Sequence, residues 1–494
     1  MNVASAATAK VEHGQFPSVD KTHIQTEIIP EIAQWSLTNG LVLASDKATV
    51  AKAAPTTVFP TPIPRQSFDQ AKALQKPFNQ LYAQIANSEW LIKETEQLAK
   101  VDPDFTGKLF NLYQKYTAKS KQPTKFGIFR SDYLIEEKTK SVKQVEFNTV
   151  SVSFGGLSSK VGDLHSYLNV MGKYDNKGKP FYQAGELHTS ESHVFIVRGI
   201  LNAMNIYQVD LESKKRERDE KIVLFVVEED ELNIYDQKII EYNLLKIYGI
   251  ISVRCTFKDI KTQFEYSTDK KRLIHKKTNN EVGVVYFRTG YDVADYSDEA
   301  AWETRGFLEE SYAIKAPDLS VQLAGTKKIQ QLLTKDSILS TYIDDANVKK
   351  QLSNSFVKIY PLDDSPEGKE GQKLAIEQPE HYVLKPQREG GGHNVYKKDI
   401  PAFLNDLPKE QWNAYILMEI IDTATRKENF IVRDGQLSSE PIISELGIYG
   451  TIIFDKDHIA NNDYSGSLLR SKLMTSNEGG VVAGFGCIDS MYLY

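Results

Sequence analysis

Cysteine is scarce in this sequence, and long apolar runs are missing from it. Only Cys255 and Cys487 occur, and neither forms a CxxC or cysteine–histidine pattern. A disulfide framework and a structural zinc site are therefore not expected, and a reducing compartment fits. No window reaches about 18 consecutive apolar residues, so no membrane span is predicted. Residues 1–10 lack the apolar core of a signal peptide and the arginines of a transit peptide, so we expect a cytoplasmic protein.

An excess of basic residues is also missing. The 494 residues carry a formal net charge of -6 at pH 7, which argues against nucleic acid as a partner because binding to phosphate backbones needs a basic excess. The composition, 41% hydrophobic and 26% charged, is typical of a globular protein. This length predicts two or three domains, preceded by a disordered tail over residues 1–24.

Helical and extended patterns alternate in the first third of the chain. Apolar residues at spacings of three and four predict helices, and short apolar runs that end in charge predict strands. The prolines of residues 60–64 exclude a helix and a central strand there. The helices are expected at residues 31–37, 68–86, 89–100 and 105–119, and the strands at 126–133 and 142–147.

Residues 222–287 follow a strand–helix–strand pattern that predicts a small parallel sheet. Ligands bind beyond the carboxyl ends of such strands. Asn233 and Gln237 follow one predicted strand, and Arg288 and Tyr291 follow another. They form a candidate site for a small anionic peptide, although an arginine after a strand is more often a surface charge.

Residues 302–333 are expected to be helical, with Lys327 as a candidate nucleotide contact. The same residues are compatible with a helix N-terminus that carries exposed charges. No P-loop is present, because Gly325 has no glycine partner at Walker spacing. Residues 360–372 are expected to form a surface loop.

The glycine-rich segment near the C-terminal quarter carries the clearest chemical signal. A predicted strand at residues 382–385 ends in Lys385, and the triplet Gly390, Gly391 and Gly392 follows Glu389. Glycine amides without a Cβ can approach phosphate oxygens, and a carboxylate can hold the Mg2+ that bridges them. A bare triple glycine is more often a mobile turn, but the neighbouring charges are unusual for a linker.

Glu146 and Asn148 lie two residues apart on a predicted strand and therefore face the same side. Both carry oxygen ligands suited to Mg2+, so they form a candidate half-site together with Glu389. A Glu-x-Asn pattern is weak by itself, and the alternative is an exposed strand end. The hydroxyl-rich residues 149–156 that follow strengthen the interpretation.

Residues 385–396 closely resemble the glycine-rich loop of eukaryotic glutathione synthetases, members of the ATP-grasp superfamily, and the resemblance extends over residues 28–494. It implies a mixed α/β ATP-grasp architecture with an inserted parallel-sheet substrate domain and a glycine-rich lid. The implied parts are an N-terminal body at 25–214, the insertion at 215–325 and a C-terminal part with lid loops at 326–494.

The family implies ligation of γ-glutamylcysteine and glycine through an acyl phosphate, with ATP as co-substrate, two Mg2+ ions and a homodimer. Glu146, Lys385 and Arg470 match its catalytic positions, and Glu146, Asn148 and Glu389 its metal ligands. The peptide and acceptor set is Arg130, Ser151, Ser153, Asn233, Gln237, Arg288, Tyr291, Arg470, Val481 and Val482. The nucleotide set is Glu146, Lys327, Lys385, Glu389, Gly390, Gly391, Gly392, Asn394, Tyr396, Met418, Glu419, Ile421, Glu445, Lys472 and Glu478.

Two residues depart from the family pattern, because asparagine is expected at His393 and alanine at Val482. Val482 lies in a second glycine-rich loop, residues 477–484, that contacts the glycine end of the product in this family. A related ligase with β-alanine or serine as acceptor, and a non-catalytic ATP-binding paralogue, are the alternatives. Retention of the metal ligands and phosphate lysines favours an enzyme.

Overall fold

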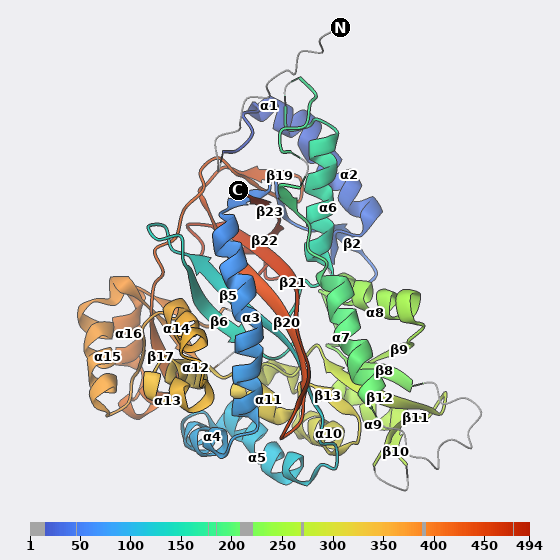
Figure 1. Ribbon diagram of the computed structural model, residues 1–494, viewed down its shortest axis with the longest axis vertical. Helices are drawn as coiled ribbons and strands as arrows, with labels where there is room; N and C mark the ends of the chain where they lie inside the picture. Colours follow the sequence, from blue (N-terminus) through green and yellow to red (C-terminus); the bar gives the residue numbers. More distant parts are fainter. Residues whose placement is uncertain are drawn as a thin grey trace.

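The computed structural model describes residues 15–45, 47–175, 177–183, 185–207, 221–267, 271–387, 392–477 and 479–494. Its mixed α/β fold contains several sheets surrounded by helices (Figure 1), and the predicted fold class is confirmed. Helix α1 (Lys21–His23) begins inside the expected tail, because the Asp20 carboxylate caps it by accepting a bond from the amide of His23. Residues 1–14 lie outside the described part of the chain.

An eight-stranded sheet forms the centre of the molecule and unites the beginning and the end of the chain. Its core pair, β20 and β21, is antiparallel, and β20 also pairs with β5. In spatial order the strands are β19 (Gln436–Ser438), β18 (Ile431–Arg433), β3 (Thr56–Thr57), β22 (Gly486–Asp489), β21 (Ile459–Leu473), β20 (Ile442–Phe454), β5 (Lys125–Ile135) and β6 (Val142–Asn148).

Helices cover both faces of this sheet. Successive residues of a strand point to opposite faces, and Gly450 of β20 lies against Asn79 of α3 (Arg65–Ala86), whereas Thr451 lies against Gly199 of α7 (Ser192–Ile206). Helix α3 therefore packs on one face and α7 on the other; in Figure 1, α3 runs alongside β20 and β21, and α7 lies to the right of these strands. The other helices of the first part are α2 (Ile29–Asn39), α4 (Glu89–Val101), α5 (Lys108–Lys115) and α6 (Leu157–Val170).

The predicted parallel sheet is present, with an antiparallel hairpin added at one edge. Strand β8 (Lys221–Val226) pairs in parallel with β9 (Ser252–Cys255) and with β12 (Asn280–Phe287), and α8 (Ile234–Tyr248) connects β8 to β9. The hairpin strands are β10 (Phe264–Tyr266) and β11 (Leu273–His275). This sheet lies at the lower right of Figure 1.

The expectation of a continuous helical region at residues 302–333 was wrong. Between α10 (Glu299–Glu310) and α11 (Leu319–Ala324) the chain forms β13 (Ile314–Ala316), which pairs in parallel with β12. The residues just before Pro317 thus supply the last strand, in chain order, of the sheet that contains β8 and β12. Lys327 begins the next helix, α12 (Lys327–Leu333).

A four-stranded antiparallel sheet carries the first glycine-rich segment. Its strands are β14 (Ile359–Pro361), β17 (Tyr415–Glu419), β15 (Tyr382–Pro386) and β16 (Val395–Tyr396). Residues 360–372 are not the expected loop, because Ser365 caps helix α15 (Pro366–Glu377) and Pro366 occupies its first turn. Helices α15 and α16 (Asp399–Asp406) pack beside this sheet at the lower left of Figure 1.

Two small sheets complete the fold. Strands β1 (Val42–Ala44) and β2 (Ala51–Ala53) form a hairpin. Strands β4 (Thr61–Ile63) and β7 (Leu187–His188) flank β23 (Met491–Leu493), so the proline-containing residues 60–64 provide an edge strand rather than a central one. No helix in the described ranges combines the length and apolar character that crossing a membrane requires.

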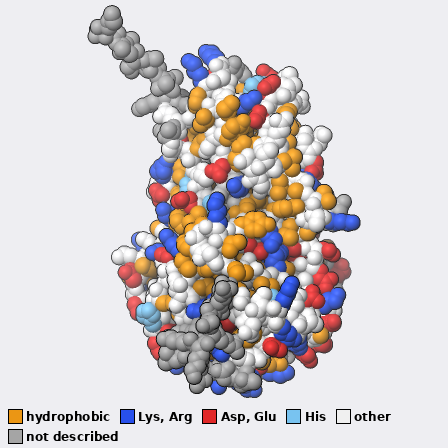
Figure 2. All heavy atoms as spheres, turned by 90° about the vertical axis from the view of Figure 1, so that its right-hand side faces the viewer, with side chains coloured by type: hydrophobic (Ala, Val, Ile, Leu, Met, Phe, Trp, Pro, Cys, Tyr) orange, Lys and Arg blue, Asp and Glu red, His pale blue; other side chains and the backbone are white. Residues whose placement is uncertain are grey.

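Several apolar side chains are exposed on and just after α8. The exposed fractions are 63% for Tyr242, 56% for Leu245, 45% for Ile247 and 39% for Ile251. Figure 2 faces the side of the molecule on which α8 lies in Figure 1, and hydrophobic side chains gather there near mid-height. Such a surface commonly marks a contact with another protein.

Asp489 at the end of β22 generates a pH prediction. Its buried carboxylate accepts hydrogen bonds from the hydroxyls of Thr57, Thr61 and Ser471, each at 2.6 Å. Burial nevertheless raises the pKa of Asp489 to about 6. A carboxyl whose pKa is higher in the folded state stabilises the fold fully below its unfolded value, and this contribution is lost as pH rises through 6.

We therefore expect Asp489→Asn to remove on the order of 3 kcal/mol of pH dependence in the free energy of unfolding between about pH 4 and about pH 7. Urea unfolding of the wild type and the variant measures the difference. The exposed Asp364→Asn is the matched control and is expected to keep the wild-type slope. Equal slopes for the wild type and Asp489→Asn would contradict the account.

Candidate functional site

A cleft of about 700 Å3 lies between the central sheet, the sheet that contains β8 and β12, and the four-stranded sheet. Its lining includes twenty of the residues predicted from the sequence. They are Arg130, Glu146, Asn148, Ser151, Ser153, Asn233, Gln237, Arg288, Tyr291, Lys385, Asn394, Tyr396, Met418, Glu419, Ile421, Glu445, Arg470, Lys472, Val481 and Val482. Glu389, Gly390, Gly391 and Glu478 lie outside the described residues.

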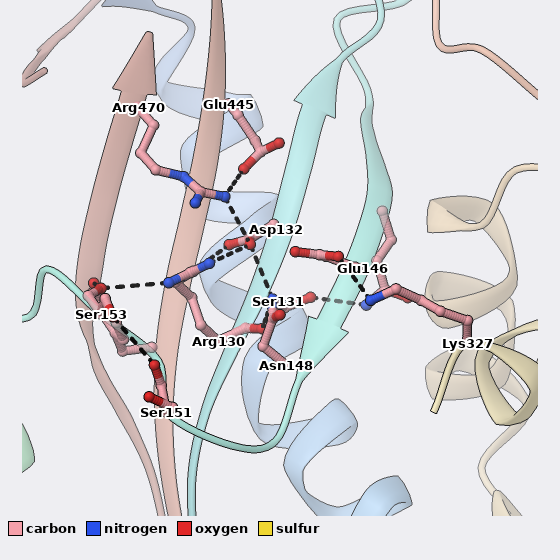
Figure 3. A network of polar contacts seen from close by, with 12 residues as sticks. Arg130, Ser131, Asp132, Glu146, Asn148, Ser151, Ser153, Lys327, Glu445 and Arg470 are labelled. Carbon is pink, nitrogen blue, oxygen red and sulfur yellow. Dashed lines mark hydrogen bonds and ion pairs between the residues drawn. The ribbon is translucent and has the colours of Figure 1, made fainter. Parts of the chain in front are cut away.

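A buried carboxylate, Asp132, joins two of the predicted arginines. Arg130, two residues earlier on β5, donates from Nε to Asp132 Oδ1 at 2.6 Å and from Nη2 to Oδ2 at 2.7 Å. Arg470 of β21 donates from Nη2 to Asp132 Oδ2 at 3.2 Å. Figure 3 shows both guanidinium groups directed at this carboxylate. Asp132 was not predicted, although its spacing from Arg130 places both on one face of the strand.

Two more strands of the sheet contribute to the same cluster. Asn148 of β6 donates from its amide to Asp132 Oδ2 at 3.0 Å, and Arg470 also donates to Glu445, its directly paired residue on β20. Gly447 faces Asp132 across β20 and β5. A Cβ at Gly447 would lie 2.9 Å from both Arg130 Cδ and Asp132 Oδ1, so the cluster needs glycine there.

Glu146 lies between lysines from two different elements. Lys327 at the start of α12 donates from Nζ to Glu146 Oε2 at 3.0 Å. Lys385 of β15 donates to the carbonyl of Val145 at 3.1 Å. Burial alone would raise the pKa of Glu146, but the charges of Lys327 and Lys385 outweigh it and hold the pKa below its usual value. Glu146 is therefore an ionised carboxylate in the wall of the cleft.

The hydroxyl-rich loop after β6 is held in an uncommon backbone conformation. Ser151 has φ of 51° and Phe154 has φ of 69°, values that residues other than glycine rarely adopt. Arg288 fixes the loop by donating from Nη1 to the carbonyl of Val152 at 2.6 Å and from Nη2 to Ser153 Oγ at 2.9 Å. Tyr449 adds a bond of 2.5 Å to the carbonyl of Ser153. Backbone strain of this kind clusters at functional sites.

The carboxyl ends of β8 and β12 meet at the cleft, as predicted. Glu231 accepts a hydrogen bond from the backbone N–H of Asn233 at 2.8 Å and one from Gln237 Nε2 at 2.6 Å. In the described part of the chain, Asn233 Oδ1 and Gln237 Oε1 are buried and have no hydrogen-bond partner. These oxygens can each accept a hydrogen bond from an N–H group.

Glu228, which the sequence interpretation missed, lies in the same wall. Its carboxylate accepts a bond of 2.9 Å from the Tyr291 hydroxyl. Burial and the charges of Glu231 and Asp295 raise the pKa of Glu228 to about 7. A raised pKa in a cleft is typical of a ligand site. The signal was available in the acidic run that directly follows the strand.

The four-stranded sheet supplies apolar side chains to the lining of the cleft. Met418 of β17 is buried opposite Val383 of β15, and Ile421 lines the cleft just beyond β17. Asn394 donates to the Tyr396 hydroxyl at 3.5 Å. Gly392 and His393 follow the undescribed residues 388–391, and His393 Nε2 lies 3.6 Å from Asp292 Oδ2, which follows β12.

A divalent cation would find suitable donors at Glu146 and Asn148. One ionised carboxylate and one amide oxygen from the same strand face fit Mg2+ when phosphate oxygens and water complete its shell. The described residues contain no group of three or more histidine, cysteine, aspartate or glutamate side chains that could hold a metal alone.

Comparisons with known proteins match nearly the whole chain to one protein family. Residues 22–493 match a family model described as "Eukaryotic glutathione synthase, ATP binding domain". The glutathione synthetase large chain of Schizosaccharomyces pombe is 40% identical over 92% of this chain and 93% of its own length. The human glutathione synthetase is 33% identical over 96% of this chain and 98% of its own length.

A solved structure shares the fold. A glutathione synthetase-like effector from Globodera pallida, in its apo form, superimposes with a TM-score of 0.74 at 20% identity, covering 97% of this chain and 98% of its own.

The close approach at Gly447 gives a stability prediction. We expect Gly447→Ala to lower the free energy of unfolding by about 1–3 kcal/mol, because its methyl group meets Arg130 and Asp132 in a packed sheet. Thermal unfolding measures the loss. Gly479→Ala is the control, since a Cβ there meets only Lys472 Cδ at 3.8 Å. Equal stability of the two variants would show that Asp132 does not need this space.

Proposed function

The chain belongs to the eukaryotic glutathione synthase family, and from that premise we propose that it is a glutathione synthetase. It is an ATP-dependent ligase that joins γ-glutamylcysteine to glycine and releases glutathione, ADP and phosphate. The observation that carries this proposal is the cleft itself, because it gathers predicted peptide residues and predicted nucleotide residues from three sheets.

The chemistry requires activation of a carboxylate. A carboxylate oxygen of γ-glutamylcysteine attacks the γ-phosphorus of ATP, the bond to ADP breaks, and an acyl phosphate forms. The glycine amine then attacks the acyl carbon, phosphate leaves with the carboxylate oxygen, and the amine loses a proton. Each step concentrates negative charge on oxygen, so the protein contributes mainly position and positive charge.

Lys327, Lys385 and Lys472 are the proposed partners of the phosphates. Lys327 is buried beside Glu146, and Lys385 and Lys472 line the cleft. Met418 and Ile421 support the adenine as an apolar wall. The rest of the proposed nucleotide set is Gly392, Asn394, Tyr396, Glu419 and Glu445, together with the undescribed Glu389, Gly390, Gly391 and Glu478.

The peptide is proposed to bind between the inserted sheet and the hydroxyl-rich loop. Arg288 and Ser153 already bond to each other and provide positive charge and a hydroxyl for a carboxylate. The unpartnered oxygens of Asn233 and Gln237 suit the ammonium or amide groups of the γ-glutamyl end. Arg470 lies between this region and Glu445 and is proposed to stabilise charge on the reacting carboxylate.

Magnesium is proposed to be held by Glu146, Asn148 and Glu389, together with phosphate oxygens. When bound, it neutralises phosphate charge as the γ-phosphoryl group is transferred. The ionised state of Glu146 supports this role, because the neighbouring lysines keep its carboxylate free of a proton. Two ions are part of the proposal.

Glycine is the proposed acceptor, and Val482 is the residue that could change this choice. Its side chain is 38% exposed at the wall of the cleft. Larger acceptors would compete with its methyl groups for space, and differences of this size change selectivity by about 10–200-fold. β-Alanine and serine are the alternatives to test.

An assay of ADP release together with product analysis tests the function. With ATP, Mg2+ and γ-glutamylcysteine, glycine is expected to give faster turnover than β-alanine or serine. Glu146→Gln is expected to lower turnover by at least about 100-fold, because one metal ligand and its charge are lost.

The exposed Glu137→Gln is the matched control and is expected to retain wild-type turnover. Faster ligation of β-alanine or serine would assign the chain to an analogue-forming ligase. Absence of a ligated product with all three acceptors would refute the proposed function.

We further propose that the protein is a homodimer that buries the exposed apolar side chains on and after α8. Tyr242 and Leu245 lie three residues apart on this helix and are 63% and 56% exposed. Burial of about 1,200–2,000 Å2 in total is typical of stable interfaces. A helix face with exposed apolar side chains fits that role.

Light scattering at micromolar concentration is expected to give the mass of a dimer for the wild type. Leu245→Glu is expected to give the monomer mass, because a charge would be buried unpaired at the interface. Val170→Glu, which alters an apolar residue that is 72% exposed on another helix, is the matched control and should remain dimeric. A monomeric wild type would refute the dimer.

A cytoplasmic location is also proposed. Cys255 and Cys487 are buried free thiols, which suits a reducing compartment. Cell fractionation that recovers the protein elsewhere would contradict it.

A further inference from the structure

The second glycine-rich loop is bound at both of its ends by basic side chains. At its start, Lys472 of β21 donates from Nζ to the carbonyl of Asn477 at 2.7 Å. At its end, Arg433 of β18 donates from Nη1 to the carbonyl of Gly484 and from Nη2 to the carbonyl of Gly486, the latter at 2.7 Å. The sequence interpretation assigned no role to Arg433.

Arg433 is itself held rigidly. It ends β18 and pairs with Gln436 across a two-residue turn made by Asp434 and Gly435. Both turn residues have positive φ, 49° and 74°, as tight hairpin turns of this kind require. Arg433 therefore extends from the β18–β19 hairpin, which forms the edge of the central sheet by pairing with β3.

The two carbonyls that Arg433 binds are separated by one residue, Phe485. A planar guanidinium offers two parallel N–H donors that suit such a pair, whereas a lysine ammonium provides only a point charge. Gly484 has φ of 91°, and a Cβ there would lie 3.1 Å from Arg433 Nη1. A side chain at position 484 would therefore strain the backbone and press on the guanidinium group of Arg433, so the contact favours glycine at this position.

Backbone hydrogen bonds within the loop connect the residues that Arg433 holds to the residues that line the cleft. The amides of Phe485 and Gly486 both donate to the carbonyl of Gly480, at 2.9 and 3.0 Å, and the amide of Gly484 donates to the carbonyl of Val481 at 3.1 Å. Val481 is buried and Val482 faces the cleft. Moving the carbonyls of Gly484 and Gly486 would therefore shift the cleft wall at residues 480–483.

We propose that Arg433 is a positioning residue for the acceptor amino acid, because it fixes the end of the loop whose residues 480–483 form the acceptor wall. The inference rests on the proposed function, since that function places the glycine acceptor at this loop. Arg433 does not touch the reacting atoms. It acts through the backbone that holds Val481 and Val482 in place.

A displaced loop would have two consequences. The acceptor would bind less tightly, and water would reach the acyl phosphate, returning the free peptide and phosphate after ATP has already been converted to ADP. ATP and peptide binding would be retained, because apart from Glu478 their proposed residues lie on other elements.

Steady-state kinetics of Arg433→Ala test the proposal. The KM for glycine is expected to rise about tenfold, with the KM values for ATP and γ-glutamylcysteine within about twofold of wild type. The ratio of ADP released to glutathione formed is expected to rise from near one in the wild type to above about two. Arg433→Lys keeps the positive charge but loses the two parallel N–H donors. Its glycine KM and its ADP-to-glutathione ratio are expected to lie between those of the wild type and Arg433→Ala.

Asp434→Asn is the matched control. It changes the adjacent turn residue and breaks the Lys52–Asp434 ion pair of 3.4 Å beside the loop, but leaves both bonds of Arg433. Wild-type KM values and ratio are expected for it.

A wild-type glycine KM and product ratio in Arg433→Ala would overturn the inference while leaving the proposed function intact. If Arg433→Ala does not fold, the same measurements are made on Arg433→Lys and Arg433→Gln. A wild-type glycine KM and product ratio in both variants would overturn the inference. A wild type that forms no glutathione would instead refute the proposed function, before any variant is compared.

Discussion

The structure of the cleft depends on one buried carboxylate, that of Asp132. It binds Arg130 on its own strand, Arg470 from the far end of the chain and Asn148 from the neighbouring strand. Removing one partner from a buried ion pair typically costs about 3–5 kcal/mol. The carboxylate therefore holds two cations of the site at fixed positions on one sheet face, and Gly447 leaves the space in which this is possible.

A second group of charges is arranged differently. Glu146 lies beside Lys327 and near Lys385, and these two lysines come from different elements, α12 and β15. In the proposed reaction these lysines would pair with phosphate oxygens and Glu146 would hold Mg2+, so the ionic contacts of the free protein would be exchanged for contacts with the ligands. The bonds of Asp132 to Arg130 and Arg470 join strands of the central sheet and involve neither Glu146 nor these lysines.

Strand alternation and parallel topology made part of this site predictable. The spacing of Glu146 and Asn148 placed both at the cleft, and the βαβ pattern placed Gln237 and Arg288 at neighbouring strand ends. Asp132 was missed, because its role depends on the pairing of β5 with β20 and β20 with β21, strands far apart in sequence. Strand β13 and helix α15 were missed because pairing with β12 and the Ser365 cap outweigh the local patterns.

Transfer of an oxygen atom tests the central claim, that this cleft activates a carboxylate by phosphoryl transfer. γ-Glutamylcysteine labelled with 18O in its cysteinyl carboxylate is incubated with the protein, ATP, Mg2+ and glycine, and the released phosphate is analysed by mass spectrometry. The account predicts one 18O atom in the phosphate for each glutathione formed. Phosphate that contains no label, while glutathione is formed, would contradict it.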